Sequence, residues 1–224
     1  MVNIIKNFKR PSAELVKAFS EQGSATVHEA MSKRGAMYSP IKPLYSGMKA
    51  CGSAFTVKSQ AGDNLMLLKA LDLAQAGDIL VVDLGQVSEE GPWGEIMTIQ
   101  AEVKGIAGLV VDGSVRDSME IKEHGFPVFC RSVSVVGTAK DSLGYINHPI
   151  SCGNTIVNPG DIILADEDGV VVIPLAEAEE ILEKSKARVA KEEKQIARIR
   201  AGESLFAMSG LQAVLDKKGC IEEK

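Results

Sequence analysis

An arginine and an aspartate stand side by side at the end of a short apolar segment, in Val110-Val-Asp-Gly-Ser-Val-Arg116-Asp117. A β-branched run that ends in a glycine turn is typical of a buried strand, so the pair is expected where a core strand opens into a loop. Open α/β sheets bind ligands at such strand ends. A guanidinium pairs with a carboxylate or phosphate, and a carboxylate binds hard cations such as Mg²⁺. The pair could therefore bind an oxyacid and a metal ion at one point.

A helix and a strand are predicted between Glu95 and Arg116, which are separated by twenty residues. They return the chain to the same edge of the sheet, so the two residues can be neighbours. The first-turn amides of Ile96 and Met97 would be free donors suited to an anionic substrate. Asn64, at the start of another predicted helix, could offer its amide to the same pocket, and the loop 84–94 is expected to shape its mouth.

Plainer interpretations of these residues stay open. Arg116 and Asp117 could form a surface ion pair at a turn. Glu95 could complement the dipole of its helix, and Asn64 could cap one. The three histidines, His28, His124 and His148, have no ligand spacing and are expected to be structural.

The elements that must position these residues alternate along the chain and predict an α/β fold. Strands are expected at 50–59, 79–83, 108–112, 126–130, 162–166 and 170–173. Helices are expected at 11–22, 65–75, 95–104 and 118–124, with a further short helix within 24–34. Ser12 and Thr26 are the expected caps of the first two helices. Ala-Gly-Asp-Ile-Leu-Val-Val-Asp and Pro-Gly-Asp-Ile-Ile-Leu-Ala-Asp are near copies, which indicates recurring hairpins.

A charged helical pattern over 175–200 separates a body, residues 1–174, from a C-terminal helical extension, residues 175–224. A helix this polar is expected to pack on a neighbouring subunit or lie along the surface. One further short helix and a frayed end are expected after residue 200.

Composition excludes several classes of protein. A chain of 224 residues with 45% hydrophobic and 25% charged residues is ordinary for a soluble domain. The net charge of −5 argues against a nucleic-acid binder. Four scattered cysteines lack a Cys-x-x-Cys pair, which argues against zinc and favours reduced thiols. The N-terminus has no signal-peptide pattern and no apolar run reaches ~20 residues, so a cytoplasmic protein without membrane contact is expected. Dinucleotide-binding and Walker-type glycine motifs are absent.

Gly94-Glu95, twenty residues, Arg116-Asp117, two residues and Glu120 together resemble the RraA-like family. That family includes class II 4-hydroxy-4-methyl-2-oxoglutarate aldolases, which are also oxaloacetate decarboxylases, and regulators of ribonuclease activity. Further matching blocks, in order, lie at 26–30, 62–65, 77–83, 166–174 and 201–203. The resemblance implies a single body of the β/β/α swivelling-domain type, assembled as a homotrimer or homohexamer with active sites between subunits.

The resemblance also implies a role for each site residue. Asp117 would be the direct ligand of Mg²⁺ or Mn²⁺, with waters filling most of the remaining positions. Arg116 would bind the keto-acid oxygen and steady the enolate. Glu95, which replaces the aspartate common in the aldolases, would hold metal-bound water.

Other residues would complete the site. The amides of Ile96 and Met97, with Asn64, would bind the pyruvate-like carboxylate. Glu192 would reach in from the adjoining subunit as a further catalytic carboxylate that holds the metal through water, with Glu193 as the neighbouring candidate. Both could instead be solvated helix charges. Glu29 is a further candidate from a partner subunit, and Leu68 stands where many relatives are expected to have histidine.

These roles describe a divalent-metal-dependent lyase that cleaves a small 2-oxo acid and releases pyruvate. Bond cleavage beside a 2-oxo group leaves an electron pair on an enolate oxygen, which a divalent cation and an arginine both stabilise. Aldol cleavage also needs a base for the 4-hydroxyl proton, whereas decarboxylation needs none. The alternatives are a non-enzymatic protein that binds and inhibits a ribonuclease, and a lyase with another sugar-acid or keto-acid substrate.

Overall fold

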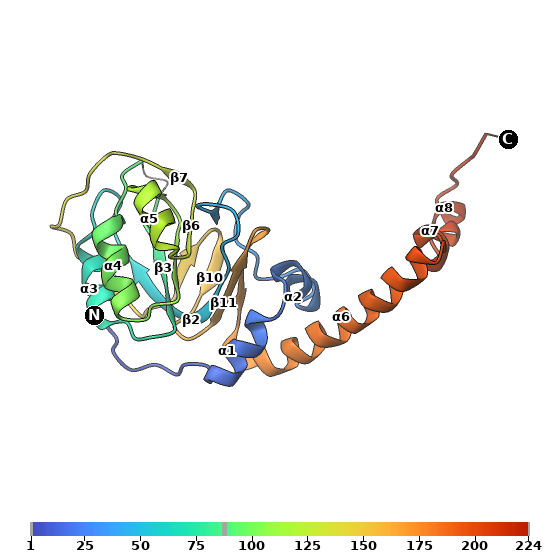
Figure 1. Ribbon diagram of the computed structural model, residues 1–224, viewed down its shortest axis with the longest axis horizontal. Helices are drawn as coiled ribbons and strands as arrows, with labels where there is room; N and C mark the ends of the chain where they lie inside the picture. Colours follow the sequence, from blue (N-terminus) through green and yellow to red (C-terminus); the bar gives the residue numbers. More distant parts are fainter. Residues whose placement is uncertain (1, 87–88, 224) are drawn as a thin grey trace.

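The computed structural model describes residues 2–86 and 89–223, and it consists of a mixed sheet between two groups of helices, with a long helical arm (Figure 1). The helices are α1 (Ala13–Ser20), α2 (Ser24–Ala30), α3 (Leu65–Leu73), α4 (Glu95–Val103), α5 (Ser118–His124), the short 3-10 helix η1 (Leu175–Glu177), α6 (Ala178–Arg200), α7 (Leu205–Met208) and α8 (Gln212–Lys217). The predicted α/β body with a C-terminal helix is confirmed.

The main sheet has the order β1-β6-β4-β3-β2-β11-β12, with β8 (Tyr145–Ile146) also paired to β2. Its strands are β1 (Lys42–Pro43), β2 (Ala50–Lys58), β3 (Asp78–Asp83), β4 (Gly108–Val111), β6 (Val128–Cys130), β11 (Ile162–Asp166) and β12 (Gly169–Ile173). The four central strands β2, β3, β4 and β6 are parallel, whereas β1, β11 and β12 pair with their neighbours antiparallel. Two small sheets pair β9 (Ile150–Cys152) with β10 (Thr155–Val157), and β5 (Ser114–Val115) with β7 (Ser132–Val133).

The two ends of this strand order come close together, so the sheet nearly closes on itself. Lys42 of β1 donates a hydrogen bond through Nζ to the carbonyl of Asp168, next to β12. Ala36, which precedes β1, forms a bridge with Val171 of β12. Near-closure leaves few free edges along the strands.

Two apolar clusters hold the helices to the sheet. The larger contains fully buried residues such as Leu67 and Leu71 of α3, Val81 of β3, Val110 of β4 and Ile121 of α5. Burying each such side chain contributes ~1.5–3 kcal/mol. The smaller joins α1, α2 and the first turns of α6 to β11 and β12. The functional loops between β3 and α5 therefore start and end in packed elements.

The near-copied segments do not both form hairpins, so that prediction is wrong for the first copy. β11 makes a hairpin with β12, but β3 pairs parallel to β2 because α3 carries the chain back before β3 begins. Both copies begin with a buried aspartate: Asp78 accepts two hydrogen bonds from Arg10, at 2.8 and 2.9 Å, and Asp161 accepts from the amides of Asn158 and Leu175.

Helix starts were predicted with mixed success. Ser12 caps α1, since its Oγ accepts the amide of Leu15. Thr26 lies inside α2, whose N-cap is Gly23, so that cap prediction is wrong. Asp166 takes the capping role from β11, because its carboxylate accepts both the amide and the hydroxyl of Ser24.

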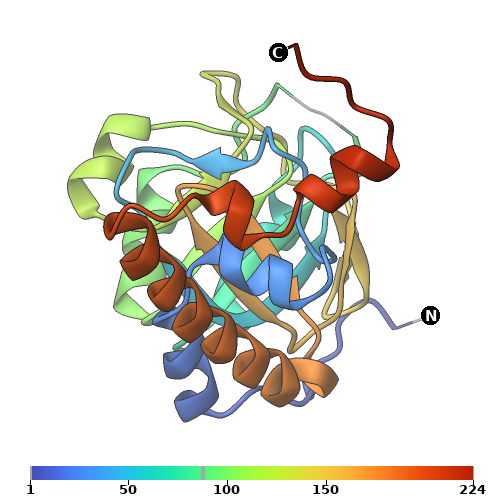
Figure 2. The ribbon, with the colours of Figure 1, turned by 90° about the vertical axis from the view of Figure 1, so that its right-hand side faces the viewer.

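Helix α6 begins against the body and then leaves it. Ala178, Ile181, Leu182 and Ser185 are buried, and Figure 2 shows the helix running beside α1 and α2. Beyond these turns α6 projects away from the sheet (Figure 1). The tail holds two short helices, α7 and α8, where the sequence predicts one, and Gly210 between them has a positive φ of 62°. No described helix is both long enough and apolar enough to span a bilayer.

Asp63 ties the start of α3 to a distant loop. Its carboxylate accepts the amide of Leu65 at 2.8 Å, and those of Asp141 and Ser142 at 2.7 and 3.0 Å. Burial opposes the charge, but these amides outweigh burial and hold the pKa of Asp63 below its ordinary value. Asp63 thus fixes Asn64 and residue 140 relative to each other.

We expect Asp63→Asn to lower the free energy of unfolding at pH 7 by about 1–3 kcal/mol, because it loses charge-assisted hydrogen bonds to three amides. A depressed pKa contributes stability that is present above the unfolded value of about 3.9 and lost as pH falls through the folded value. The gap between variant and wild type should therefore shrink below about pH 4. Urea unfolding at pH 7 and pH 3 measures it.

Asp72→Asn is the matched control, since Asp72 is exposed and pairs with Lys69 within α3. An equal loss for Asp63→Asn at both pH values would contradict the assigned role of the carboxylate.

Candidate active site

A cavity of about 270 Å³ lies at the N-terminus of α4. We call it the α4 cavity, and its lining includes Asn64, Trp93, Met97, Arg116, Asp117 and Lys140. These residues come from the N-cap of α3, the segment 91–97, the turn between β5 and α5, and the loop after β7. Five of the six residues predicted to meet here from this chain line it: Asn64, Ile96, Met97, Arg116 and Asp117.

Backbone hydrogen bonds bring the start of α4 against the turn before α5. The amide of Glu95 donates to Asp117 Oδ2 at 3.0 Å, and the amide of Arg116 donates to the carbonyl of Trp93 at 2.9 Å. A Cβ atom at Gly94 would overlap the Asp117 carboxylate, so the close approach requires glycine there. The predicted helix–strand return is therefore present, with the two ends in direct contact.

Asp117 is held in a conformation that few aspartates adopt. Its φ is 53° and its ψ is 44°, in the left-handed region, at the N-cap of α5. Backbone strain of this kind costs of order 1–3 kcal/mol and concentrates at functional sites. Asp117 Oδ2 also lies 3.6 Å from Arg116 Nε, and both side chains stay more than a third exposed, at 37% and 47%. Arg116 and Asp117 thus form an ion pair, as the plainer interpretation holds, and both residues also line the α4 cavity.

The α4 N-terminus supplies unused donors. Within the described residues, the amides of Ile96 and Met97 have no hydrogen-bond acceptor. Free amides and the positive end of the helix dipole favour an anion at this point. Met97 is buried in the cavity wall, while the side chain of Ile96 is exposed.

Asn64 lies at the N-cap position of α3 without capping it, because the Asp63 carboxylate accepts the Leu65 amide instead. The Asn64 Nδ2 donates to the Pro92 carbonyl at 3.1 Å. Its Oδ1 is buried without a hydrogen-bond partner. Asn64 therefore keeps a buried, unpaired acceptor and uses its amide on Pro92, whereas the sequence predicts that its amide serves the pocket.

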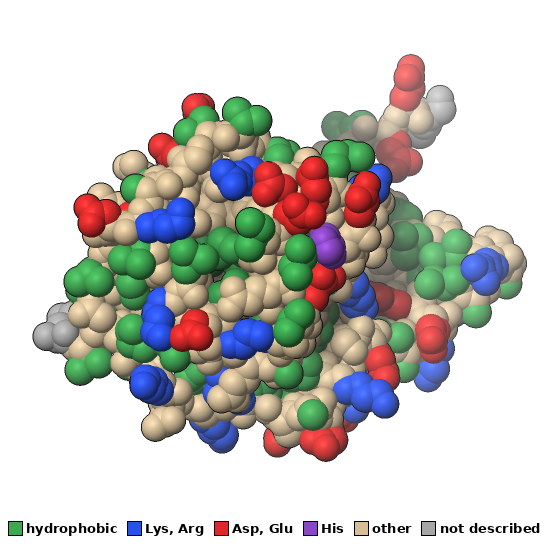
Figure 3. All heavy atoms as spheres, turned by 60° about the vertical axis from the view of Figure 1, so that its left-hand side comes forward, with side chains coloured by type: hydrophobic (Ala, Val, Ile, Leu, Met, Phe, Trp, Pro, Cys, Tyr) green, Lys and Arg blue, Asp and Glu red, His purple; other side chains and the backbone are tan. Residues whose placement is uncertain are grey.

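The side chain of Glu95 lies beside His124 of α5. Its Oε1 is 3.9 Å from His124 Nε2, and His124 Nδ1 is 3.0 Å from Glu102 Oε2. Figure 3 shows the face that carries α3, α4 and α5, where acidic side chains gather around a histidine. Glu95 does not line the cavity, unlike its two neighbours on α4.

Glu29 and Glu192 lie far from the α4 cavity of their own chain. They flank Arg188 on the other side of the sheet, where Arg188 Nε is 2.8 Å from Glu192 and Nη1 is 3.7 Å from Glu29. Figure 1 shows α2 and α6 on the side of the sheet opposite to α3, α4 and α5. Their predicted role requires a second subunit and stays a prediction, as does that of Glu193.

Lys140 is the residue that sequence reasoning missed. It lies in the loop after β7, and the Asp63 carboxylate anchors the amide of the next residue. No motif surrounds it in the sequence; only the tertiary contact between α3 and this loop brings its cation to the cavity. Leu68 also lines the cavity, and so do residues 91–94 of the predicted mouth loop; its residues 87 and 88 lie outside those described.

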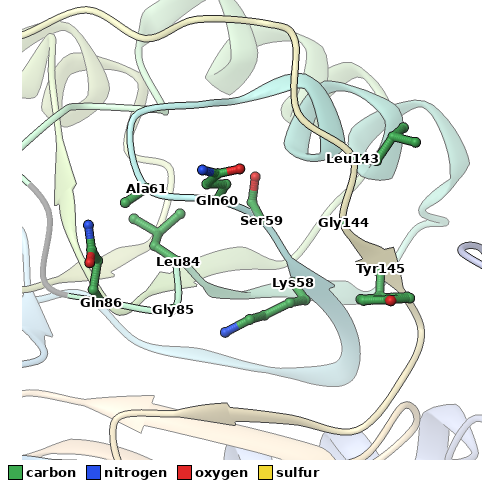
Figure 4. Close-up of a pocket in the computed structure, with 10 residues that line it drawn as sticks. All are labelled: Lys58, Ser59, Gln60, Ala61, Leu84, Gly85, Gln86, Leu143, Gly144 and Tyr145. Carbon is green, nitrogen blue, oxygen red and sulfur yellow. The ribbon is translucent and has the colours of Figure 1, made fainter.

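A larger cavity, about 420 Å³, opens at the carboxyl ends of β2 and β3 (Figure 4). Its cation, Lys58, already pairs with Asp83 at 2.6 Å, and Asp83 also accepts the amide of Gly85. None of the residues predicted to do chemistry lines it. The smaller α4 cavity is therefore the candidate active site.

Known proteins resemble this chain in both sequence and fold. A Halalkalibacterium halodurans protein named "Putative 4-hydroxy-4-methyl-2-oxoglutarate aldolase" is 38% identical over 180 residues, covering 80% of this chain and 86% of that protein. The crystal structure of an uncharacterized protein from Pseudomonas syringae pv. tomato matches with a TM-score of 0.79 and 25% identity, over 92% of this chain and 97% of that one. Streptomyces coelicolor RraAS2, described as an unusual member of the RNase ES inhibitor RraA protein family, matches with a TM-score of 0.74 and 30% identity, over 86% and 99%.

The family model described as "RraA-like: Aldolase/RraA" matches residues 24–172, a segment that contains every residue found to line the α4 cavity. The resemblance inferred from the motifs is thus confirmed, and this chain belongs to the RraA-like family.

Proposed function

We propose that this protein is a divalent-metal-dependent lyase that acts on a small 2-oxo acid in the α4 cavity. Its substrate would be 4-hydroxy-4-methyl-2-oxoglutarate or a close analogue, oxaloacetate, or both, with pyruvate as product. The observation that carries the proposal is the meeting of Arg116, Asp117 and the unused amides of Ile96 and Met97 at one cavity. The aldolase name of the Halalkalibacterium halodurans relative supports it.

The donor groups fit Mg²⁺ or Mn²⁺. One oxygen of Asp117 accepts the Glu95 amide, and within the described chain the other has no hydrogen-bond partner. No three of the described His, Cys, Asp and Glu side chains cluster as a closed metal cage would require. Mg²⁺ is commonly held by one or two carboxylates while it keeps several waters. Asp117 would hold the cation directly and Glu95 through water, and the bound ion would supply a Lewis acid for the 2-oxo group.

The protein groups would bind and polarise the substrate. The amides of Ile96 and Met97 would donate hydrogen bonds to its 1-carboxylate, and Lys140 would attract its second carboxylate. As the C3–C4 bond breaks, its electron pair moves onto C3 and the 2-oxo oxygen. Arg116 offers a fixed positive charge where that charge develops, so its interaction strengthens in the transition state.

Proton movement separates the two reactions. Aldol cleavage requires transfer of the 4-hydroxyl proton to a base, and Glu192 of an adjoining subunit would supply that base. Decarboxylation of oxaloacetate loses CO₂ instead and needs no base. In both, protonation of the enolate at C3 yields pyruvate, so one cavity could serve both substrates.

We further propose that the sites are shared within a homotrimer or homohexamer. Helix α6 leaves the body and carries exposed Ile196 and Ile199, which are 48% and 42% exposed. Exposed apolar residues also line the outer face of α4 beside the cavity, with Ile96 and Val103 at 81% and 83% exposed. Packing the arm of one subunit against α4 of the next would bury both surfaces. It would also bring Glu192 of one subunit to the α4 cavity of the next, whereas Glu192 lies far from the α4 cavity of its own chain.

Asp117→Ala should abolish metal-stimulated pyruvate release from oxaloacetate, because it removes the proposed direct ligand. A loss of about a hundredfold or more in kcat/KM is expected, on the scale of removing a principal stabilising group. A coupled assay for pyruvate, with Mg²⁺ and with EDTA, measures it.

Asp72→Ala, in an exposed ion pair on α3, is the control and should keep wild-type activity. Equal rates for wild type and Asp117→Ala, unaffected by EDTA, would overturn the proposal. The alternative, a ribonuclease inhibitor, predicts instead a ribonuclease complex that survives Asp117→Ala.

Shared sites predict complementation between defective subunits. Arg116→Ala and Glu192→Gln should each be inactive alone, but co-expressed chains should recover activity at about a quarter of the sites, by random mixing of equal amounts. The recovered site takes its cavity from one chain and Glu192 from the other.

Arg116→Ala mixed with Asp117→Ala is the matched control, because both defects lie in the same cavity and no mixed site is intact. Recovery in neither mixture, despite verified co-assembly, would place the complete site within one chain.

A further inference from the structure

The side chain of Thr98 forms a buried clamp below the α4 cavity. Trp93 Nε1 donates to Thr98 Oγ1 at 2.8 Å, and Thr98 Oγ1 donates in turn to the Gly94 carbonyl at 3.1 Å. Both side chains are fully buried, and the Trp93 ring stacks on Phe126 with centroids 6.0 Å apart. A threonine hydroxyl bonded to the carbonyl four residues earlier is ordinary in a helix. The bond from the Trp93 indole comes from outside the helix, and it fixes the segment 91–94 that precedes α4.

This clamp holds the segment that touches Arg116 and Asp117. The Trp93 carbonyl accepts the Arg116 amide, and the Gly94–Glu95 step lies against the Asp117 carboxylate. At Gly91 an added Cβ would lie 3.0 Å from Arg116 Cβ, so this end of the segment is in contact as well. A shift of residues 91–94 must therefore move both side chains of the candidate site.

We propose that Thr98 is a positioning residue for the reaction assigned to the α4 cavity, acting through Trp93 and Gly94 on Arg116 and Asp117. The expected effect of Thr98 on kcat rests on the proposed function, whereas its effect on the position of residues 91–94 does not. Thr98 touches no substrate. Its hydroxyl sets the place of the segment 91–94, and that segment sets the geometry of the guanidinium and the carboxylate. Among the described residues, no other side chain accepts the Trp93 indole hydrogen.

Thr98→Val keeps the side-chain shape but removes both hydrogen bonds. We expect kcat for pyruvate release to fall by up to about a hundredfold, the cost that a displacement of about 1 Å can have. Thr98→Ser keeps the hydroxyl and should recover most of the lost kcat. Thr56→Val is the matched control: Thr56 is equally buried, on β2, and donates to the His148 carbonyl at 2.7 Å away from the cavity. It should lower Tm to a similar degree yet leave kcat unchanged.

Trp93 supplies a second measurement that does not depend on activity, because it is the single tryptophan of the chain. Acrylamide should quench its fluorescence more strongly in Thr98→Val than in wild type, Thr98→Ser or Thr56→Val. A Thr98→Val protein whose kcat falls no further than that of Thr56→Val overturns the positioning role. If wild type releases no pyruvate, the proposed function fails, and the quenching comparison alone decides on the clamp: unchanged quenching in Thr98→Val rejects it.

Discussion

The candidate site depends on one close approach, between the backbone at Gly94–Glu95 and the carboxylate of Asp117. The Glu95 amide donates to Asp117 Oδ2 at 3.0 Å, and nothing larger than the hydrogen of Gly94 fits between the two segments. The parallel pairing of β3 with β4 makes this approach possible, because α4 must cross over the sheet and return the chain to the same edge. The twenty residues between Glu95 and Arg116 contain the rest of α4 followed by β4 and β5, which together make the return from the helix to the strand end.

The strain at Asp117 follows from the same constraint. A carboxylate that must meet the start of α4 and still face the cavity takes a left-handed backbone, and packed elements on both sides keep it there. Val115 before it is fully buried, and Ile121 one turn into α5 is fully buried as well. Burial of these apolar side chains thus offsets the strain energy of the left-handed backbone at Asp117, a conformation that a free peptide would rarely adopt.

The sequence predicted the elements well where periodicity and turn residues agree, as for α5, whose bounds match, and for β2, β3 and β11. It predicted that Arg116 and Asp117 meet the start of α4 because a local helix–strand return sets their spacing, and it placed Asn64 at the same pocket from its position at the start of another helix. It failed where a partner lies far along the chain. Lys140 reaches the cavity only through the tie from Asp63, and the Glu95–His124 contact arises between two helices. The expected Thr26 cap failed for the same reason, since Asp166 of β11 accepts the Ser24 amide.

The two halves of the implied site lie on opposite sides of the sheet. Arg116, Asp117 and the α4 amides belong to the rigid body, whereas Glu192 sits on the projecting part of α6, held by Arg188 together with Glu29. Helix α6 leaves the core of its own chain after two turns, and its isoleucines beyond that point are exposed. Within one chain, burial therefore stabilises the projecting part of α6 very little. Under the proposed function, assembly would therefore do more than stabilise the protein. It would add a carboxylate to a cavity that in one chain has an arginine, a lysine and a single aspartate, and so decide how many negative charges face the cation.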